Sequence, residues 1–257
     1  MIQQPVQIPT RGGELEGIVR LPRGQGPFPT VVLVVGQGMT LHEWKGSFDE
    51  IAERLVTEGF ATVQFAFDVF DKDGNIHELP VFVRASRVED VLAWTQKQAF
   101  VDAGKVGVIG QSYGVATVTA AHLQGVASVV LVSGVYFLYD SLIRVYTQRG
   151  TVFNFEGDTI MKRPAGDVWV SKEYWTEAKS FDQLALTKKM SMPVFMVQGD
   201  NDKYTVEEEV EAVYNALPNA HKKTKTFQGG DHGINNVPRP MRDEFLADLV
   251  AWFKETL

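Results

Sequence analysis

The sequence predicts an α/β protein with a mainly parallel, doubly wound sheet. Apolar runs of strand length alternate with stretches of helical periodicity along most of the chain. Several of these runs are apolar at every position, which is typical of strands that are buried on both faces by helices. The 257 residues are enough for one large domain with an insertion.

The N-terminal part of the chain predicts two short strands, a buried strand and a helix. The short strands are expected at Val6–Pro9 and Leu15–Leu21. After a Gly- and Pro-rich connection, Thr30–Val35 is apolar on both faces and predicts a strand inside the sheet. Ser47 and, three residues later, Glu50 form a capping-box signal, which predicts that a helix begins there.

The middle of the chain continues the alternation. Phe60–Phe67 predicts the next strand, and Arg84–Gln98 predicts a helix. The apolar run Val106–Ile109 predicts another strand, and the small residues Val115–Ala121 predict a helix soon after it. A further strand is expected at Ser128–Ser133.

The C-terminal part predicts two strand and helix pairs. Pro193–Val197 is a buried strand by its composition, and Thr205 with Glu208 three residues on marks the start of a helix. Lys222–Phe227 is expected to be the last strand. The last helix is expected from about Arg239.

The segment Val135–Ser191 departs from this rhythm, since it is long for a connection between a strand and a helix. The fraction of aromatic residues in this segment is about twice that in the rest of the chain. We expect residues 1–134 and 192–257 to form the core domain and residues 135–191 to form a cap or lid. A crossover helix with a small satellite core is the alternative. Its ten aromatic residues are Tyr136, Phe137, Tyr139, Tyr146, Phe153, Phe155, Trp169, Tyr174, Trp175 and Phe181.

Charge and composition restrict the classes of partner. The net charge of −7 argues against nucleic acid or an anionic membrane as the main partner. The absence of cysteine excludes disulfides, a thiolate nucleophile and cysteine-bound metal. The N-terminus lacks a signal-peptide pattern, and no segment approaches the roughly 20 apolar residues of a membrane span. We therefore expect a cytoplasmic protein, with a homodimer left open.

The most informative motif is the pentapeptide Gly110-Gln111-Ser112-Tyr113-Gly114, which has the form G-x-S-x-G. It lies between a predicted strand and a predicted helix, the context in which this pentapeptide becomes a nucleophile elbow. The sharp turn forces the serine into a strained conformation and needs glycine on either side. Ser112 is therefore the candidate nucleophile.

A serine hydroxyl needs a base to take its proton, and the base needs a carboxylate to orient it. On an elbow of this type the partners follow in the order Ser, Asp or Glu, His. His232 lies in a Gly-rich loop after the last strand and is the candidate base. Asp202, on the turn after Pro193–Val197, is preferred as the carboxylate because it precedes a helix start. Asp200 is expected to brace that turn, and Asp231 is a remote alternative.

The remaining histidines have other expected roles. His122 is placed in the elbow helix, His77 in a polar loop and His221 in a charged turn. His42 follows the first buried strand and could line the pocket.

An acyl-transfer site also needs backbone N–H groups that face a developing oxyanion. One is expected from Tyr113, directly after the nucleophile. The other is expected from the loop after Thr30–Val35, where Gln37 is preferred and Gly38 is the alternative.

Taken together, the elbow, the Gly199-x-x-Asp202 turn and the glycine-flanked His232 make the chain resemble the α/β-hydrolases over nearly its whole length. Within that superfamily it is similar to esterases with compact caps, including cinnamoyl and feruloyl esterases. The resemblance places a cap where residues 135–191 lie. Two departures are Val35-Gly36, where the family often has His-Gly, and Asp68, which lacks the family's Arg-Gly continuation.

The combined expectation is a serine hydrolase that cleaves small apolar or aromatic carboxylic esters through an acyl-enzyme. It needs no metal and no organic cofactor. Amide, peptide and thioester hydrolysis use the same residues and stay open. A non-catalytic ligand-binding sensor on the same fold is the alternative from another class. An imidazole base also predicts that activity falls on the acid side as the imidazole becomes protonated.

Overall fold

The computed structural model describes residues 1–163 and 166–257. Within them, eight strands form one sheet whose central and C-terminal strands are parallel, with an antiparallel hairpin at the N-terminal edge. The predicted mainly parallel α/β sheet is confirmed. Across the sheet the strands are β1 (Ile2–Thr10), β2 (Gly13–Leu21), β4 (Ala61–Phe65), β3 (Phe28–Val34), β6 (Val101–Gln111), β7 (Val126–Val132), β10 (Val194–Gly199) and β11 (Lys222–Phe227).

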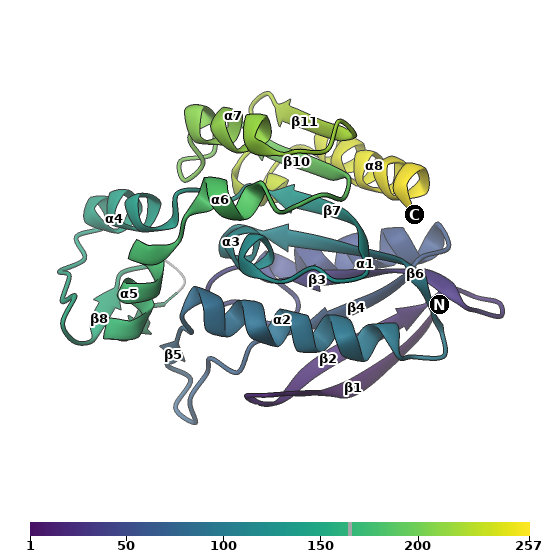
Figure 1. Cartoon of the computed structure of the whole chain (residues 1–257), viewed down its shortest axis with the longest axis horizontal. Helices are drawn as coiled ribbons and strands as arrows, with labels where there is room; N and C mark the ends of the chain where they lie inside the picture. Colours follow the sequence, from purple (N-terminus) through teal and green to yellow (C-terminus); the bar gives the residue numbers. More distant parts are fainter. Residues whose placement is uncertain (164–165) are drawn as a thin grey trace.

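Helices cover both faces of this sheet, as Figure 1 shows. The apolar strands between these helices are therefore shielded from water. The first face carries α2 (Val81–Gln96), α3 (Tyr113–Ala120), α6 (Gln183–Thr187) and α7 (Glu207–Ala216). The second carries α1 (Ser47–Thr57) and α8 (Arg239–Thr256).

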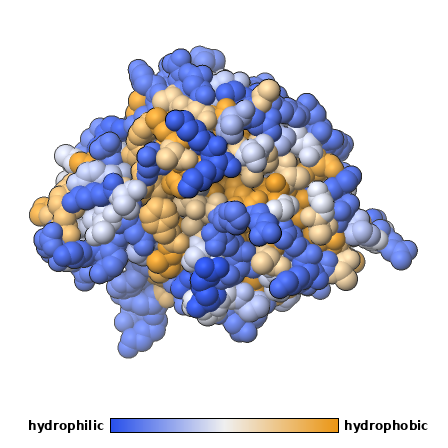
Figure 2. Space-filling model, in the orientation of Figure 1, coloured by the Kyte–Doolittle hydropathy of each residue, from blue (hydrophilic) through white to orange (hydrophobic). Residues whose placement is uncertain are grey.

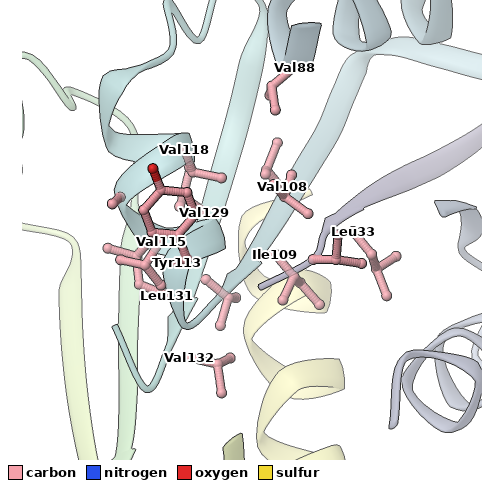
Figure 3. Packing of buried hydrophobic residues seen from close by; sticks show 14 of the residues in the cluster. Leu33, Val88, Val108, Ile109, Tyr113, Val115, Val118, Val129, Leu131 and Val132 are labelled. Carbon is pink, nitrogen blue, oxygen red and sulfur yellow. The ribbon is translucent and has the colours of Figure 1, made fainter. Parts of the chain in front are cut away.

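The core lies on both faces of the central strands. In Figure 3, Val108 of β6 and Val129 of β7 lie near Val115 and Val118 of α3, whereas Leu33 of β3 lies farther to the right, away from α3. All five are fully buried. The β-branched side chains suit the pleated surface of the strands. This packing gives the C-terminal end of β6 a rigid base. Hydrophilic residues dominate the outer surface in Figure 2, with apolar residues in a band across the middle of that face.

Two predictions about helix starts are wrong in detail. Ser47 begins α1, but it has helical dihedrals behind Gly46 at φ 77°, so its side chain does not cap the helix. Helix α7 begins at Glu207 instead of Thr205. The Thr205 hydroxyl instead donates to Asp202 Oδ2 at 2.9 Å. In both places the observed backbone or side-chain hydrogen bond differs from the local capping pattern.

The segment 135–191 has secondary structure of its own. It contains α4 (Leu138–Gln148), β8 (Thr159–Met161), β9 (Val168–Val170) and α5 (Lys172–Ser180) before α6. Strands β8 and β9 form a small sheet with β5 (Ile76–His77), so His77 lies in a strand where a polar loop was expected. These elements lie to one side of the main sheet in Figure 1.

The aromatic residues of this segment pack on one another. Trp175 is 1% exposed and makes edge-to-face contacts with Tyr139, Phe153, Phe155 and Tyr174, at centroid distances of 5.3–6.4 Å. A satellite core therefore explains much of the aromatic excess. A lid role for the segment stays a prediction. Among residues 1–163 and 166–257, no helix combines the length and apolarity needed to cross a bilayer.

Candidate active site

Ser112 lies on a sharp turn between β6 and α3. Its backbone has φ 56° and ψ −121°, a conformation that costs energy for a residue with a side chain. The flanking glycines make the turn possible: a Cβ on Gly114 would lie 2.3 Å from the carbonyl oxygen of Val34, and one on Gly110 would lie 2.8 Å from that of Gly114. The turn therefore presents the Ser112 hydroxyl at the C-terminal edge of the sheet.

His232 connects two side chains that are far apart in sequence. Its Nε2 lies 2.9 Å from Ser112 Oγ, and its Nδ1 lies 2.8 Å from Asp202 Oδ2. The three residues follow β6, β10 and β11, whose C-terminal ends share one edge of the sheet. Because a carboxylate only accepts hydrogen bonds, Nδ1 carries the proton and Nε2 is left to accept the Ser112 hydroxyl proton.

The surroundings of the Asp202 carboxyl favour its ionised form. Burial by itself raises its pKa, but the His232 imidazole and hydrogen bonds from the Tyr204 amide and the Thr205 hydroxyl outweigh burial and hold the pKa below its usual value. A charged carboxylate at this position favours the protonated imidazole that forms when His232 accepts a proton.

The two other aspartates considered from the sequence contact backbone amides. Asp200 Oδ1 accepts from Gly229 N–H at 2.5 Å and so ties the β10 turn to the histidine loop. Asp231 accepts from Asn235 and Asn236. Among the described residues, His232 Nδ1 contacts the carboxylate of Asp202 alone.

The loop after β3 is held so that one amide stays unused. Gly36 N–H donates to Glu43 Oε2, and Gly38 N–H donates to Glu78 Oε2, each at 2.6 Å. The N–H groups of Gln37 and Tyr113 donate to no atom of the described residues, and both residues line the cavity beside Ser112. Gly38, the alternative oxyanion donor, is thus already engaged.

A buried ion pair missed by the sequence analysis supports this loop. Arg84 Nη1 lies 3.0 Å from Glu78 Oε1, and the two side chains are 1% and 0% exposed. The guanidinium also donates to the carbonyl oxygens of Val35 and Gly36 and lies over the rings of Phe67 and Tyr113, 4.0 and 4.8 Å from their centroids. The sequence signal was an arginine at helical spacing from the core residues Val88 and Val91.

Replacing Arg84 with methionine is expected to lower the free energy of unfolding by about 3–5 kcal/mol, since the buried Glu78 carboxylate would lose its partner. Urea denaturation measures this change. The double variant Arg84→Met/Glu78→Gln should recover part of the loss, because neither charge is then left alone. A single variant as stable as the wild type would contradict the structural role of the pair.

Glu43 offers a matched pair of substitutions. Burial raises the pKa of its carboxyl, although the Gly36 and Trp44 amides, His232 and Arg84 oppose this. A carboxyl whose pKa is raised on folding contributes stability below its unfolded pKa and loses it as pH rises through the folded pKa. Glu43→Gln keeps an acceptor for Gly36, so it should match the wild type near pH 4 and be more stable near pH 8.

Glu43→Ala is the control, because it leaves the Gly36 N–H without its partner. We expect it to cost about 1–3 kcal/mol in urea denaturation near pH 4, and part of this loss to be offset near pH 8 by removal of the buried charge. A Glu43→Gln variant that is less stable than the wild type near pH 8 would show that the buried charge itself stabilises the fold.

A cavity of about 450 Å³ opens beside Ser112. The segment 135–191 supplies part of its wall through α4, and the loops after β3 and β10 supply much of the rest. His42 is not a wall residue and pairs with Asp49 at 2.7 Å, contrary to the role considered for it. In the described part of the chain, no group of three or more His, Cys, Asp or Glu side chains is arranged to hold a metal ion. The apolar wall residues are Met39, Trp44, Val135, Leu142, Val145 and Tyr146.

Comparison with a family model identifies the family of the chain. Residues 85–257 match the model of the prolyl oligopeptidase family. The chain belongs to the prolyl oligopeptidase family. Its curated relatives include the peroxisomal succinyl-coenzyme A thioesterase of Mus musculus, 29% identical over 136 residues, and the acyl-coenzyme A thioesterase 1 of Rattus norvegicus, 26% identical over 133 residues. The matches cover 51% and 50% of this chain but only 30% and 29% of the relatives, so the aligned part spans less than a third of their length.

Solved structures with a similar fold align with nearly the whole length of this chain. Est1E from Butyrivibrio proteoclasticus with bound ferulic acid superposes with a TM-score of 0.82 at 19% identity and 98% coverage of both chains. An esterase domain of a Rhodothermus marinus protein gives 0.73 at 17% identity and 99% coverage of both. The α/β-hydrolase fold implied by the sequence resemblance is thus confirmed.

Proposed function

We propose that this chain is a serine hydrolase of carboxylic esters in which Ser112, His232 and Asp202 form the catalytic triad. The observation that carries the proposal is the position of the His232 ring, which lies 2.9 Å from the Ser112 hydroxyl and 2.8 Å from a buried carboxylate. Nucleophile and base within hydrogen-bond distance, with the base oriented by a third group, is the arrangement that activates a serine.

The proposed reaction is acyl transfer in two halves. Ser112 Oγ attacks the ester carbonyl while His232 Nε2 takes the hydroxyl proton, and the oxyanion accepts hydrogen bonds from the amides of Gln37 and Tyr113. His232 then donates its proton to the leaving alcohol. Water, activated by the same imidazole, cleaves the acyl-enzyme and restores Ser112. The apolar wall of the cavity supports small apolar or aromatic acyl groups.

Thioester hydrolysis is the second candidate, because acyl-coenzyme A thioesterases are among the relatives. The same residues would act, with a thiol as the leaving group. Turnover of p-nitrophenyl hexanoate and of an S-hexanoyl thioester of N-acetylcysteamine, measured side by side, separates the two activities. A higher kcat/KM for the thioester would favour the second candidate.

A fluorophosphonate probe tests the nucleophile independently of substrate choice. The expected result is loss of turnover in step with labelling, and an adduct that mass spectrometry locates on the peptide containing Ser112. Full labelling of a different residue with loss of turnover would reassign the nucleophile. Absence of both labelling and turnover would favour the non-catalytic ligand-binding alternative.

A further inference from the structure

Three basic side chains line the proposed active-site cavity: Arg149, Arg163 and Lys203. Among the described residues, none of them has a carboxylate oxygen within 4.0 Å. Other cations of the same region are paired: Arg144, on α4, lies 2.8 Å from Glu209, and Lys162 pairs with Asp167. The protein as a whole is negative, with a net charge of −7. The group of basic residues in the cavity is therefore a local feature of this site.

Arg149 lies close to the reacting groups. Its Nη2 donates to the Tyr204 hydroxyl at 2.6 Å, and its guanidinium lies 5.1 Å from the ring centroid of Tyr146 and 4.9 Å from that of Tyr204. The Tyr204 ring packs edge-on against His232 at 4.8 Å. One aromatic ring thus separates the guanidinium from the imidazole. The two tyrosines fix the orientation of Arg149 and leave it at the cavity wall.

Arg163 and Lys203 approach the cavity from other directions. Arg163 donates to the carbonyl oxygen of Gln37, in the loop after β3. Lys203 follows Asp202 directly in sequence. The Arg163 guanidinium has five N–H donors, so some of them stay free for a ligand after the contact with Gln37. The basic groups therefore come from the residue that follows α4, the loop after β8, and the turn after β10.

The carboxylates at the cavity wall do not neutralise this charge. They belong to Glu43 and Asp231. Glu43 accepts from the Gly36 amide at 2.6 Å, and burial raises its pKa. Asp231 accepts from the amides of Asn235 and Asn236. Both acids therefore hold the loop backbone in place and leave the three cations available to a ligand.

We propose that the substrate of this hydrolase carries a carboxylate, separated from the scissile bond by a short apolar chain, and that Arg149 with Arg163 and Lys203 binds it. The inference rests on the proposed hydrolase function and specifies its substrate class. A planar guanidinium matches a carboxylate in shape, and the bond is stronger where water is partly excluded. The apolar wall at Leu142 and Val145 would hold the intervening chain.

Two pairs of isosteric esters test the substrate class and show which side of the ester bears the charge. Monomethyl adipate and methyl hexanoate differ by a carboxylate in place of the terminal methyl of the acyl chain. The pair 4-acetoxybutyrate and butyl acetate makes the same exchange on the alcohol. In a pH-stat assay, we expect kcat/KM to favour the charged member of one pair by at least about tenfold. Sodium chloride at about 0.5 M should reduce this preference.

Variants identify the groups that bind the charge. Arg149→Gln and Lys203→Gln should each lower the ratio of charged to neutral kcat/KM, and Arg149→Lys should restore part of it. Lys188→Gln, which removes an exposed cation outside the cavity, is the control for net charge and should leave the ratio unchanged. If Arg149→Gln slowed both members of each pair equally, Arg149 would be a packing residue and the inference would fail.

The outcomes separate the inference from the proposed function. Hydrolysis of the neutral esters without preference for either charged partner overturns the inference and leaves the hydrolase intact. If no ester is cleaved, calorimetric titration of Ser112→Ala with monomethyl adipate still decides the inference. The inference is supported if Ser112→Ala binds monomethyl adipate and the additional substitution Arg149→Gln weakens this affinity at least about tenfold. It is overturned if the ester does not bind, or if the additional substitution leaves the affinity unchanged.

Discussion

Replacing Ser112 with alanine is expected to lower kcat for ester hydrolysis by at least about a thousandfold. The substitution removes the only atom that the mechanism allows to bond to the acyl carbon, whereas the cavity and the free amides of Gln37 and Tyr113 stay in place. KM should therefore change much less than kcat. Initial rates with p-nitrophenyl hexanoate over a range of concentrations give both constants.

The matched control is Ser180→Ala, an exposed serine at the end of α5. Its kcat should equal that of the wild type, and both variants should unfold at the same urea concentration as the wild type. A Ser112→Ala enzyme that keeps a tenth of the wild-type kcat would refute the acyl-enzyme mechanism.

The sequence predicts the sheet and the three site loops because these depend on local signals. Runs such as Thr30–Val35 are apolar whatever surrounds them, and the Gly110–Gly114 turn requires glycine for reasons of backbone geometry alone. Since parallel strands end at one edge, the order Ser112, Asp202, His232 was enough to bring the three residues to the same place.

The rest of the site depends on contacts that no local pattern encodes. Arg84 has its carboxylate partner, Glu78, in the loop before its own helix, but its other partners, Val35 and Gly36, follow β3. Arg149 faces the cavity because Tyr146 and Tyr204, from two separate elements, hold it there. The segment 135–191 likewise depends on aromatic packing around Trp175. Its composition showed an excess of aromatic residues but not which of their rings are in contact.

The choice between the two aspartates of the β10 turn gives the second large effect. Asp202→Asn is expected to lower kcat by about 10⁴, as loss of the triad carboxylate does in serine proteases, because an amide can favour the wrong tautomer of His232 and cannot stabilise its charged form. Asp200→Asn, two residues away, keeps an oxygen that can accept from Gly229 N–H and should cost less than about tenfold.

The pair is informative because the two variants remove the same charge from the same turn. A general electrostatic effect of that charge on His232 would slow both enzymes to a similar extent. A specific role for Asp202 requires a difference of at least about a hundredfold in kcat between them. The buried Asp202 side chain has His232 Nδ1 at 2.8 Å, whereas Asp200 is exposed and bonds to the Gly229 backbone. We therefore expect direct contact with the imidazole, and not proximity along the chain, to decide which aspartate the reaction needs.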